Sequence, residues 1–528
     1  MKKYIVFALA WFFVFGVQAQ EELHKEIIDV VKDFRPKIMQ AHKIKSQPLF
    51  IDTTKVSENL KYLIRFEEFR VMQNLDSLSS RILKRNSLKN LYTKHVELGL
   101  GTSLNPHLAL DFSNGKSTKS MYQAYLNYNG AFSENANSQD KFSKFNFGGI
   151  YKRVFTKFLL QSDLLFEDNF RYDLQNTSYR NSNVAFNSAF QFTDTSRVLV
   201  PWEMTLSTYV FFRNTEFNEY EISLSSIHSG KYKQLRDWDL ENDLAFIQSN
   251  NLNTIHWNSS FSSEKSIDRS KLLLGINTDL LANDFKVFPE LRAQYELIKK
   301  GLFTYAEVGG NRHLYSLRNV YGANAYTNDS FIITKDGLPS NTKYFARIGV
   351  NGNLFRGVSY QVSAEVNTQD GFMHFINYNH LDDASLIPKF TKVNMVELMA
   401  QVDAKWTDKF HVWLKGEYKS FDEYLSHIPE FKIGLYGNYH YNDQWFMSSS
   451  VRYIGAREYL VLSDVIGLVS VPYQVNSMLD INCKVNFAYN NQIGFYVEGL
   501  NLLDNRIGFW QQELLIGRRL NIGAKYRF

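Results

Sequence analysis

Apolar and polar side chains alternate along most of the chain, with a period of two that begins at His95 and continues to the C-terminus. In residues 358–367 the apolar side chains stand at even positions, and residues 396–406 repeat this pattern with the exception of Met399. A period of two indicates β-strands whose two faces meet different surroundings. The runs match the length of about 9–11 residues that a tilted strand needs to cross a bilayer. Because strands of soluble sandwiches are commonly about 5–6 residues long, the pattern predicts an all-β fold, a transmembrane antiparallel β-barrel.

Charged residues within the alternating runs share the parity of the polar face. Asp403, Lys405, Glu417 and Lys484 all lie opposite the apolar set. A charge on the lipid face near the midplane would cost about 2–4 kcal/mol, so we expect these side chains to line the lumen. Cys483 has lipid-facing parity and is expected to be a small apolar filler. Aromatic residues stand at the ends of the apolar faces, as an interfacial girdle requires: Trp406, Phe410, Tyr439, Tyr441, Trp445 and Tyr489.

Short and long connections alternate between the expected strands. Tight turns are predicted at 299–300, 407–408, 442–443 and 490–491, and long polar connections at 130–142, 171–181, 315–340, 369–389 and 458–473. In outer-membrane barrels the short turns are periplasmic and the long loops extracellular. With both termini in the periplasm, the barrel of residues 93–528 is expected to have about 22 strands, and about 16 as a lower bound. Phe372 to Asn377 is interpreted as part of a loop.

The first 19 residues predict a secretory signal peptide. Lys2 and Lys3 precede an uninterrupted apolar stretch at 5–17, and the small residue Ala19 suits cleavage before Gln20. The apolar stretch is short for a membrane anchor, which is the alternative. The mature chain is therefore expected to be exported.

Residues 20–92 form an N-terminal segment without the alternating pattern. Apolar residues at helical spacing predict one short helix that ends at Pro36, and a basic cluster follows between Arg81 and Lys94. The cluster is interpreted as a solvated face, with a docking patch as the alternative. This partly helical segment is expected to lie in the periplasm or to fill the lumen.

Composition narrows the class further. Charged residues make up 21% of the chain and aromatic residues 15%, with one cysteine and a net charge of +5. One thiol excludes a disulfide scaffold, and the aromatic content excludes a disordered chain. No apolar run reaches the roughly 20 residues of a membrane-spanning helix. The small positive charge gives no reason to expect a nucleic-acid partner.

Catalytic signatures are missing from the sequence. It contains no G-x-S-x-G, G-x-x-x-x-G-K or H-E-x-x-H motif, so no catalytic residue, cofactor or metal site is predicted and the protein is not expected to be an enzyme. A hydrolase with a distant Ser/His pair remains an alternative. His374, His380, Asp382 and Asp383 share one predicted loop, but their spacing matches no established metal site, so they are interpreted as solvated. His411 and His440 have lumen parity and are interpreted as polar wall lining.

The long connections are rich in aromatic residues. Two hypotheses stay open for these rings: they stack on a ligand at the outer mouth, or they pack on each other and close the pore. The residues are Tyr315, Tyr321 and Tyr326 in one connection and Phe372, Phe375 and Tyr378 in the next.

The last 30 residues resemble the closing hairpin of TonB-dependent receptors. The resemblance lies in Gly499 to Asn505, in the pair Gly517-Arg518, and in the run from Asn521 to Phe528. It implies an outer-membrane transport barrel for a solute, surrounded by outer-membrane lipid and coupled to TonB-type or other envelope proteins. It also implies that Tyr526 and Phe528 form the signal read by the barrel-assembly machinery. The wealth of Asn, Tyr, Phe and Lys is similar to the receptor-like barrels of Bacteroidota.

The N-terminal segment departs from this family. Residues 20–92 are too few and too helical for a complete plug domain, and residues 26–31 fit either an energy-coupling box or the helical stripe. The alternative function is therefore a plugless structural or assembly component that acts through protein partners.

Overall fold

In a computed structural model, the described residues are 93–528 without 103, 115–118, 133–140, 157, 173–177, 193–201, 215, 233–234, 250–251, 283, 300, 328–337, 356, 378–385, 464–468 and 506–516. The signal peptide, the cleavage site at Ala19 and Gln20, and the segment 20–92 lie outside them. The barrel belongs to a compact unit that runs from Arg85 to Phe528. No helix among the described residues is long and apolar enough to span a membrane.

The described part of the chain contains the helix α2 (Leu317–Ala323) and 24 strands. The strands are β1 (Lys94–Gly101), β2 (His107–Ser113), β3 (Ser120–Ala131), β4 (Phe142–Val154), β5 (Phe158–Tyr172), β6 (Ser178–Phe192), β7 (Trp202–Arg213), β8 (Glu216–Tyr232), β9 (Leu235–Ser249), β10 (Leu252–Ile267), β11 (Ser270–Leu281), β12 (Asp284–Ile298), β13 (Leu302–Leu314), β14 (Ser340–Phe355), β15 (Val358–Asn377), β16 (Leu386–Thr407), β17 (Phe410–Phe421), β18 (Phe431–His440), β19 (Trp445–Ile454), β20 (Arg457–Ser463), β21 (Val469–Val475), β22 (Met478–Ala488), β23 (Ile493–Leu500) and β24 (Arg519–Arg527).

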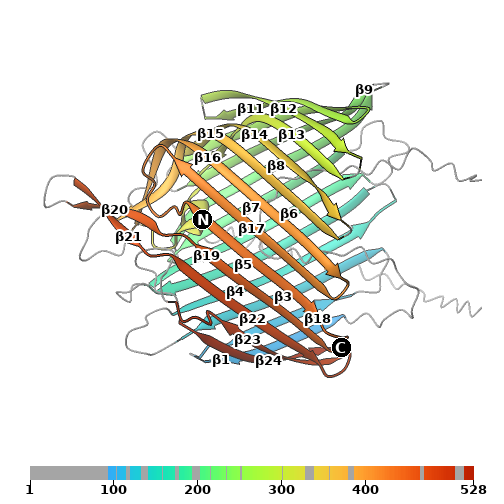
Figure 1. Cartoon of the computed structure of the whole chain (residues 1–528), viewed down its shortest axis with the longest axis vertical. Helices are drawn as coiled ribbons and strands as arrows, with labels where there is room; N and C mark the ends of the chain where they lie inside the picture. The colour runs from blue at the N-terminus through green and yellow to red at the C-terminus, as the bar shows by residue number, and fades with distance from the viewer. Residues whose placement is uncertain are drawn as a thin grey trace, which may run out of the picture. The chain divides into compact units, whose positions relative to one another are not determined.

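Twenty-two of these strands close into one antiparallel barrel (Figure 1). Consecutive strands pair with each other, β19 pairs with β22, and β24 returns to pair with β1. The closed ladder satisfies the backbone groups that hydrocarbon cannot, which is what a spanning sheet requires. The barrel and the strand number predicted from the alternation are therefore confirmed. The remaining two strands, β20 and β21, form a hairpin that meets the wall at the bridge between Asn377 and Val461.

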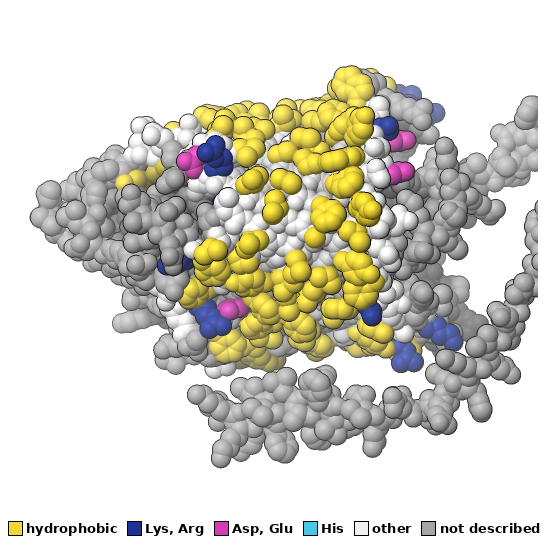
Figure 2. Space-filling view, turned by 90° about the horizontal axis from the view of Figure 1, so that it is seen from below, with side chains coloured by type: hydrophobic (Ala, Val, Ile, Leu, Met, Phe, Trp, Pro, Cys, Tyr) yellow, Lys and Arg dark blue, Asp and Glu magenta, His cyan; other side chains and the backbone are white. Residues whose placement is uncertain are grey.

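Parity separates the two faces of the wall as predicted. On β14 to β16, Ile348, Val362 and Leu398 are 64%, 45% and 46% exposed, whereas Ser363 and Glu365 are buried. Figure 2 shows one outer face on which hydrophobic side chains spread between two edges, and Lys, Arg, Asp and Glu gather at those edges. Such an apolar band between charged edges fits a lipid bilayer, and closed barrels of this kind belong to outer membranes.

The two rims of the barrel differ in their connections. The tight turns predicted at 299–300, 407–408, 442–443 and 490–491 all join neighbouring strands on one rim, which we call the short-turn rim. The opposite, long-loop rim carries the connections between β3 and β4, β13 and β14, β15 and β16, and β19 and β22. By the rule for outer-membrane barrels, the long-loop rim faces the exterior.

One strand boundary differs from the sequence-based prediction. Phe372 to Asn377, interpreted as loop, belongs to β15 and pairs with β16, so the connection is 378–385 rather than 369–389. A bulge between Gln369 and Phe372 shifts the pairing, and Gly371 has φ +90° there. A Cβ atom at Gly371 would lie 2.1 Å from the carbonyl oxygen of Ser340, so glycine is required. The bulge breaks the period of two while the strand continues, and this is why the pattern suggested a loop.

Two other long connections contain regular structure. The connection at 315–340 holds α2, and the predicted loop at 458–473 contains most of the β20–β21 hairpin. The predicted connection at 171–181 is shorter in the structure, since β5 ends at Tyr172 and β6 begins at Ser178.

A charge cluster and an aromatic ring join the first and last strands. The Glu97 carboxylate on β1 lies 3.1 Å from Lys525 Nζ on β24 and 3.4 Å from Lys484 Nζ on β22. Tyr496 on β23 lies beneath Gly99 and Gly523. A Cβ atom at Gly99 would fall 2.1 Å from its hydroxyl oxygen, and one at Gly523 would fall 2.3 Å from a ring carbon. The two glycines therefore make room for the tyrosine across the closing seam.

Placing a charge on the outer face near the middle of the band should destabilise the barrel. We expect Val362→Lys to lower the free energy of unfolding by about 2–4 kcal/mol, because the ammonium group would enter hydrocarbon. The measurement is urea titration of the barrel folded in lipid vesicles. Gln361→Lys is the matched control, since the neighbouring side chain faces the lumen and should change stability by less than about 0.5 kcal/mol. Equal effects of the two substitutions would contradict the assignment of faces.

Candidate functional site

Ion pairs line the lumen across β13, β14 and β15. Arg347 donates two hydrogen bonds to Glu365 Oε2, at 2.9 and 2.6 Å, and lies 3.5 Å from Glu307. Lys343 Nζ lies 2.6 Å from the other oxygen of Glu365. Asn367 also donates to Glu365, at 2.8 Å. The carboxylate is thus surrounded by donors on the water-facing side of the wall, as lumen parity predicts.

A second network on β10 to β13 is centred on a fully buried ion pair. Arg312 Nη1 lies 3.2 Å from Asp279 Oδ1, and neither side chain is exposed. His256 Nε2 lies 2.7 Å from the same carboxylate, and Arg312 Nη2 lies 2.5 Å from Asp284 Oδ2. A buried charge is stable only when its partners remain in place, so the network fixes the ends of these strands near the long-loop rim.

The connection from β13 to β14 folds inward and is anchored on β8. Glu219 Oε2 accepts hydrogen bonds from the backbone N–H of Leu317 at 2.6 Å and from Ser249 Oγ at 2.8 Å. The carboxylate therefore lies at the N-terminus of α2, where unpaired N–H groups favour a negative charge. Arg318 on the helix pairs with Glu221 on β8 at 3.3 Å. Two lumen-facing carboxylates of one strand hold the helix against the wall.

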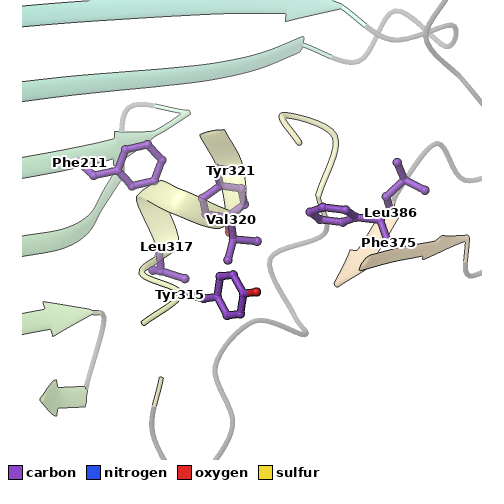
Figure 3. Close-up of a cluster of buried hydrophobic side chains, with 7 residues drawn as sticks. All are labelled: Phe211, Tyr315, Leu317, Val320, Tyr321, Phe375 and Leu386. Atoms are coloured by element: carbon purple, nitrogen blue, oxygen red, sulfur yellow. The ribbon is translucent and has the colours of Figure 1, made fainter. Parts of the chain in front are cut away.

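An aromatic cluster joins this helix to both sides of the mouth (Figure 3). Phe211 on β7 stacks on Tyr321 with ring centroids 5.6 Å apart, and Arg213 lies 3.8 Å above the Tyr321 ring. On the other side of the helix, Tyr315 packs with Phe375 and Leu386 from β15 and β16. The connection thus spans the mouth from β7 to β16. Tyr315, Tyr321 and Phe375 are thus buried in one cluster, with Phe211 and Phe390 among their ring partners, which favours packing over the binding of a ligand.

A second inward connection, residues 422–430, joins β17 to β18 and packs on the inner face of β16. Leu425 is buried against Val393 and Met395 on the inner face of β16. Ser426 N–H donates to His374 Nδ1 at 3.1 Å, and the His374 Nε2 nitrogen lies 2.9 Å from Thr391 Oγ1. Since Nδ1 accepts, Nε2 carries the hydrogen and donates to the threonine.

His374 is therefore not a solvated loop residue, which corrects the interpretation from spacing. It lies on β15, is 1% exposed, and anchors the connection 422–430. Its predicted neighbours His380, Asp382 and Asp383, and the ring of Tyr378, lie outside the described residues. Within the described part of the chain no three His, Cys, Asp or Glu side chains come together as metal ligands.

His411 and His440 lie on the lumen face, as the alternation of the strands predicts. His411 Nε2 lies 2.8 Å from Asp403 Oδ2, and the His440 ring packs on Phe446 with centroids 4.5 Å apart. Tyr526 and Phe528 are 44% and 42% exposed at the short-turn rim, with ring centroids 5.2 Å apart. Their role in barrel assembly stays a prediction.

His427 is a buried titratable group in the connection 422–430. Its side chain is fully buried, its backbone N–H donates to the carbonyl of Glu458 at 2.7 Å, and its ring stacks on Tyr459. Burial, and then the nearby charges of Arg457 and His374, lower the pKa of His427 to about 3. Burial and the neighbouring Glu458 raise the pKa of Tyr424 in the same connection, so this phenol stays neutral as well.

We expect the connection 422–430 to open as pH falls from about 6.5 to about 3. In this window the opened histidine binds a proton and the buried one does not, so the closed form loses stability; below about 3 both forms are protonated and the loss stops. Hydrogen exchange of 422–430 as a function of pH measures this. His427→Phe should reduce the dependence, and the part that remains belongs to His374, whose neutral ring accepts from Ser426. An identical pH profile in the variant would contradict a role for His427.

The wall, its closure and its charged lumen define a 22-stranded outer-membrane barrel of the kind seen in TonB-dependent receptors. The FrpB iron transporter from Neisseria meningitidis (F3-3 variant) superposes with a TM-score of 0.64 over 84% of this chain and 82% of that chain, at 9% identity. The pyoverdine receptor FpvA from Pseudomonas aeruginosa PAO1 gives 0.63 over 84% and 80% at 12% identity. The copper transporter OprC gives 0.59 over 84% and 81% at 12% identity. No protein-family model and no curated protein sequence matches the chain. At such identities the likeness shows the fold alone.

Proposed function

We propose that this chain is a transport barrel of the outer membrane that admits a solute through its lumen. The observation that carries the proposal is the closed 22-stranded wall with ion pairs on its inner face. A wall of this size encloses more space than its own side chains fill. The inward connections at the mouth would then control entry. The structural neighbours named as iron and copper transporters support this reading.

The test combines a conductance and a growth measurement. Purified protein in planar bilayers should give discrete conductance steps, and deletion of the gene should remove growth on one of a panel of nutrients. The absence of conductance steps together with unchanged growth on every nutrient would overturn the proposal. A detergent-active hydrolase whose activity a Ser or His substitution abolishes would favour the enzyme alternative.

Energy coupling is the finer part of the proposal. The C-terminal motif supports a TonB-receptor-like barrel with TonB-type envelope proteins as partners. The wealth of Asn, Tyr, Phe and Lys supports the Bacteroidota type, and the short segment 20–92 supports the lack of a complete plug. Deletion of residues 26–31 should abolish uptake if they form a coupling box. Unchanged uptake would indicate passive entry.

Export and processing complete the proposal. A mature chain that begins at Gln20 is the expected product, and its intact mass measures this directly. Cysteines introduced at Ser57 and Ser87 should react with a periplasmic thiol reagent if residues 20–92 lie in the periplasm. Protection of both would instead favour a lumen-filling segment.

The packed mouth supports a second candidate, a structural or assembly component that acts through protein partners. Tyr315, Tyr321 and Phe375 are buried in one cluster that joins opposite sides of the rim. This candidate predicts no conductance and stable co-purification with other envelope proteins.

A further inference from the structure

An apolar groove opens on the outer wall where β18, β19 and β22 reach the short-turn rim. Its volume is about 300 Å³, and its lining consists of Tyr439, Tyr441, Trp445, Phe446, Met447 and Val485. Tyr439, Trp445 and Met447 are 40%, 43% and 39% exposed and have lipid-facing parity. The groove therefore opens toward lipid at the level of the aromatic girdle.

Above the groove the wall carries a row of small side chains. Gly437 lies opposite Ser449, and Ser449 lies opposite Cys483. All three have the parity of the lipid face, and they follow directly above Met447 and Val485. Short side chains there extend the depression by one row toward the middle of the bilayer, and the next row, Leu435, Val451 and Ile481, closes it. At this depth of the bilayer an acyl chain is the apolar group that meets the wall.

A positive charge stands beside the mouth of the groove. Lys409, on the turn between β16 and β17, donates a hydrogen bond from Nζ to the carbonyl oxygen of Tyr441 at 3.3 Å. The ammonium group thus lies next to a residue that lines the groove, at the depth of lipid head groups. Asp408 and Asp443 stand on the same two turns and partly offset the positive charge of Lys409.

We propose that this groove holds one acyl chain of an anionic phospholipid from the adjoining leaflet, with the lipid phosphate at Lys409. Tyr439, Tyr441 and Trp445 flank the chain near the head group, where amphipathic rings are favoured. The small residues Gly437, Ser449 and Cys483 receive its continuation. Such a lipid is a bound ligand of defined position, distinct from the exchanging annulus around the rest of the wall.

The test is lipid titration of the delipidated full-length protein, followed by native mass spectrometry. The probes are phosphatidylglycerol, which is anionic, and phosphatidylethanolamine, which is zwitterionic. One phosphatidylglycerol should bind more tightly than all later ones. Cys483→Leu and Ser449→Leu should each weaken this first binding by about tenfold, because they fill the groove. Lys409→Gln should weaken phosphatidylglycerol by about fivefold and phosphatidylethanolamine by less, because both lipids carry the phosphate but only phosphatidylglycerol has a net negative charge.

Ala364→Leu is the matched control. Ala364 also has lipid-facing parity, between Ile348 and Leu398, but lies away from the groove, so binding should be unchanged. A heat-dependent shift on a denaturing gel confirms that each variant is folded. Equal affinity of the first and later lipids, or equal binding by Cys483→Leu and Ala364→Leu, would overturn the site. Equal binding of both lipids by the unsubstituted protein would overturn the role of Lys409.

Discussion

Replacing Ser316 to Thr327 with a short Gly/Ser linker should raise the single-channel conductance of the protein severalfold. The segment crosses the mouth from β7 to β16, and it is held there by contacts at both ends. Arg213 Nη2 donates to the carbonyl oxygen of Thr327 at 2.5 Å, and Leu386 N–H donates to the carbonyl oxygen of Tyr326 at 3.1 Å. Without the segment, ions meet the lumen directly. The measurement is current across a planar bilayer that contains one purified barrel.

A substitution at Glu219, which anchors α2, tests whether releasing the helix is enough to open the mouth without removing the segment. Glu219→Gln should give intermittent openings, because the neutral amide holds the α2 N–H groups less strongly than the carboxylate does. Asp243→Asn is the matched control: it neutralises a lumen carboxylate on the neighbouring strand β9 and should leave the current steady. A conductance that the linker does not change would contradict the assignment of this connection as the constriction.

Arg312→Met should lower the free energy of unfolding by about 3–5 kcal/mol, since it leaves the buried Asp279 carboxylate without its cation. The guanidinium also holds Asp284, so the pairing between β12 and β13 should loosen near the long-loop rim. Urea titration in lipid vesicles, monitored by tryptophan fluorescence, measures the loss.

The double variant Asp279→Asn/Arg312→Met tests the cause. Removing both charges should restore most of the lost stability, because an unpaired charge costs more than a missing pair. Lys271→Met is the control for removing a cation from the lumen, since its partner Glu264 is 39% exposed and remains hydrated. A double variant as unstable as Arg312→Met alone would place the effect in packing rather than in charge.

The sequence predicted the wall well because a lipid face imposes one rule on every strand. Val362 and Leu398 had to face hydrocarbon and Glu365 the lumen, and each alternation carries that information without reference to its neighbours. The tight turns were found for the same reason, since they are the points where the alternation stops. The bulge at Gly371 is the exception, because an extra residue inverts the parity and resembles the end of a strand.

The mouth could not be predicted in the same way. Glu219 has ordinary lumen parity, and nothing in the sequence indicates that it lies at the N-terminus of α2, almost a hundred residues later. Ser426 lies in the connection 422–430 and His374 lies on β15, and their hydrogen bond depends on the curvature of the closed wall. The aromatic content of residues 315–326 did signal a cluster. It could not show whether the partners of the rings were each other or a ligand.

The ends of the barrel meet at the short-turn rim, where Lys94 N–H and Phe528 N–H each bond to the other residue's carbonyl oxygen, at 3.1 and 3.0 Å. The wall is a continuous ring of strands, so the strand at which the chain begins does not change the closed barrel. A rearranged gene that opens the ring at Asn490 and Asn491 and joins the old ends should encode the same cylinder. What the present order does set is which strand closes the ring: the wall stays open until the nine-residue β24 pairs with β1.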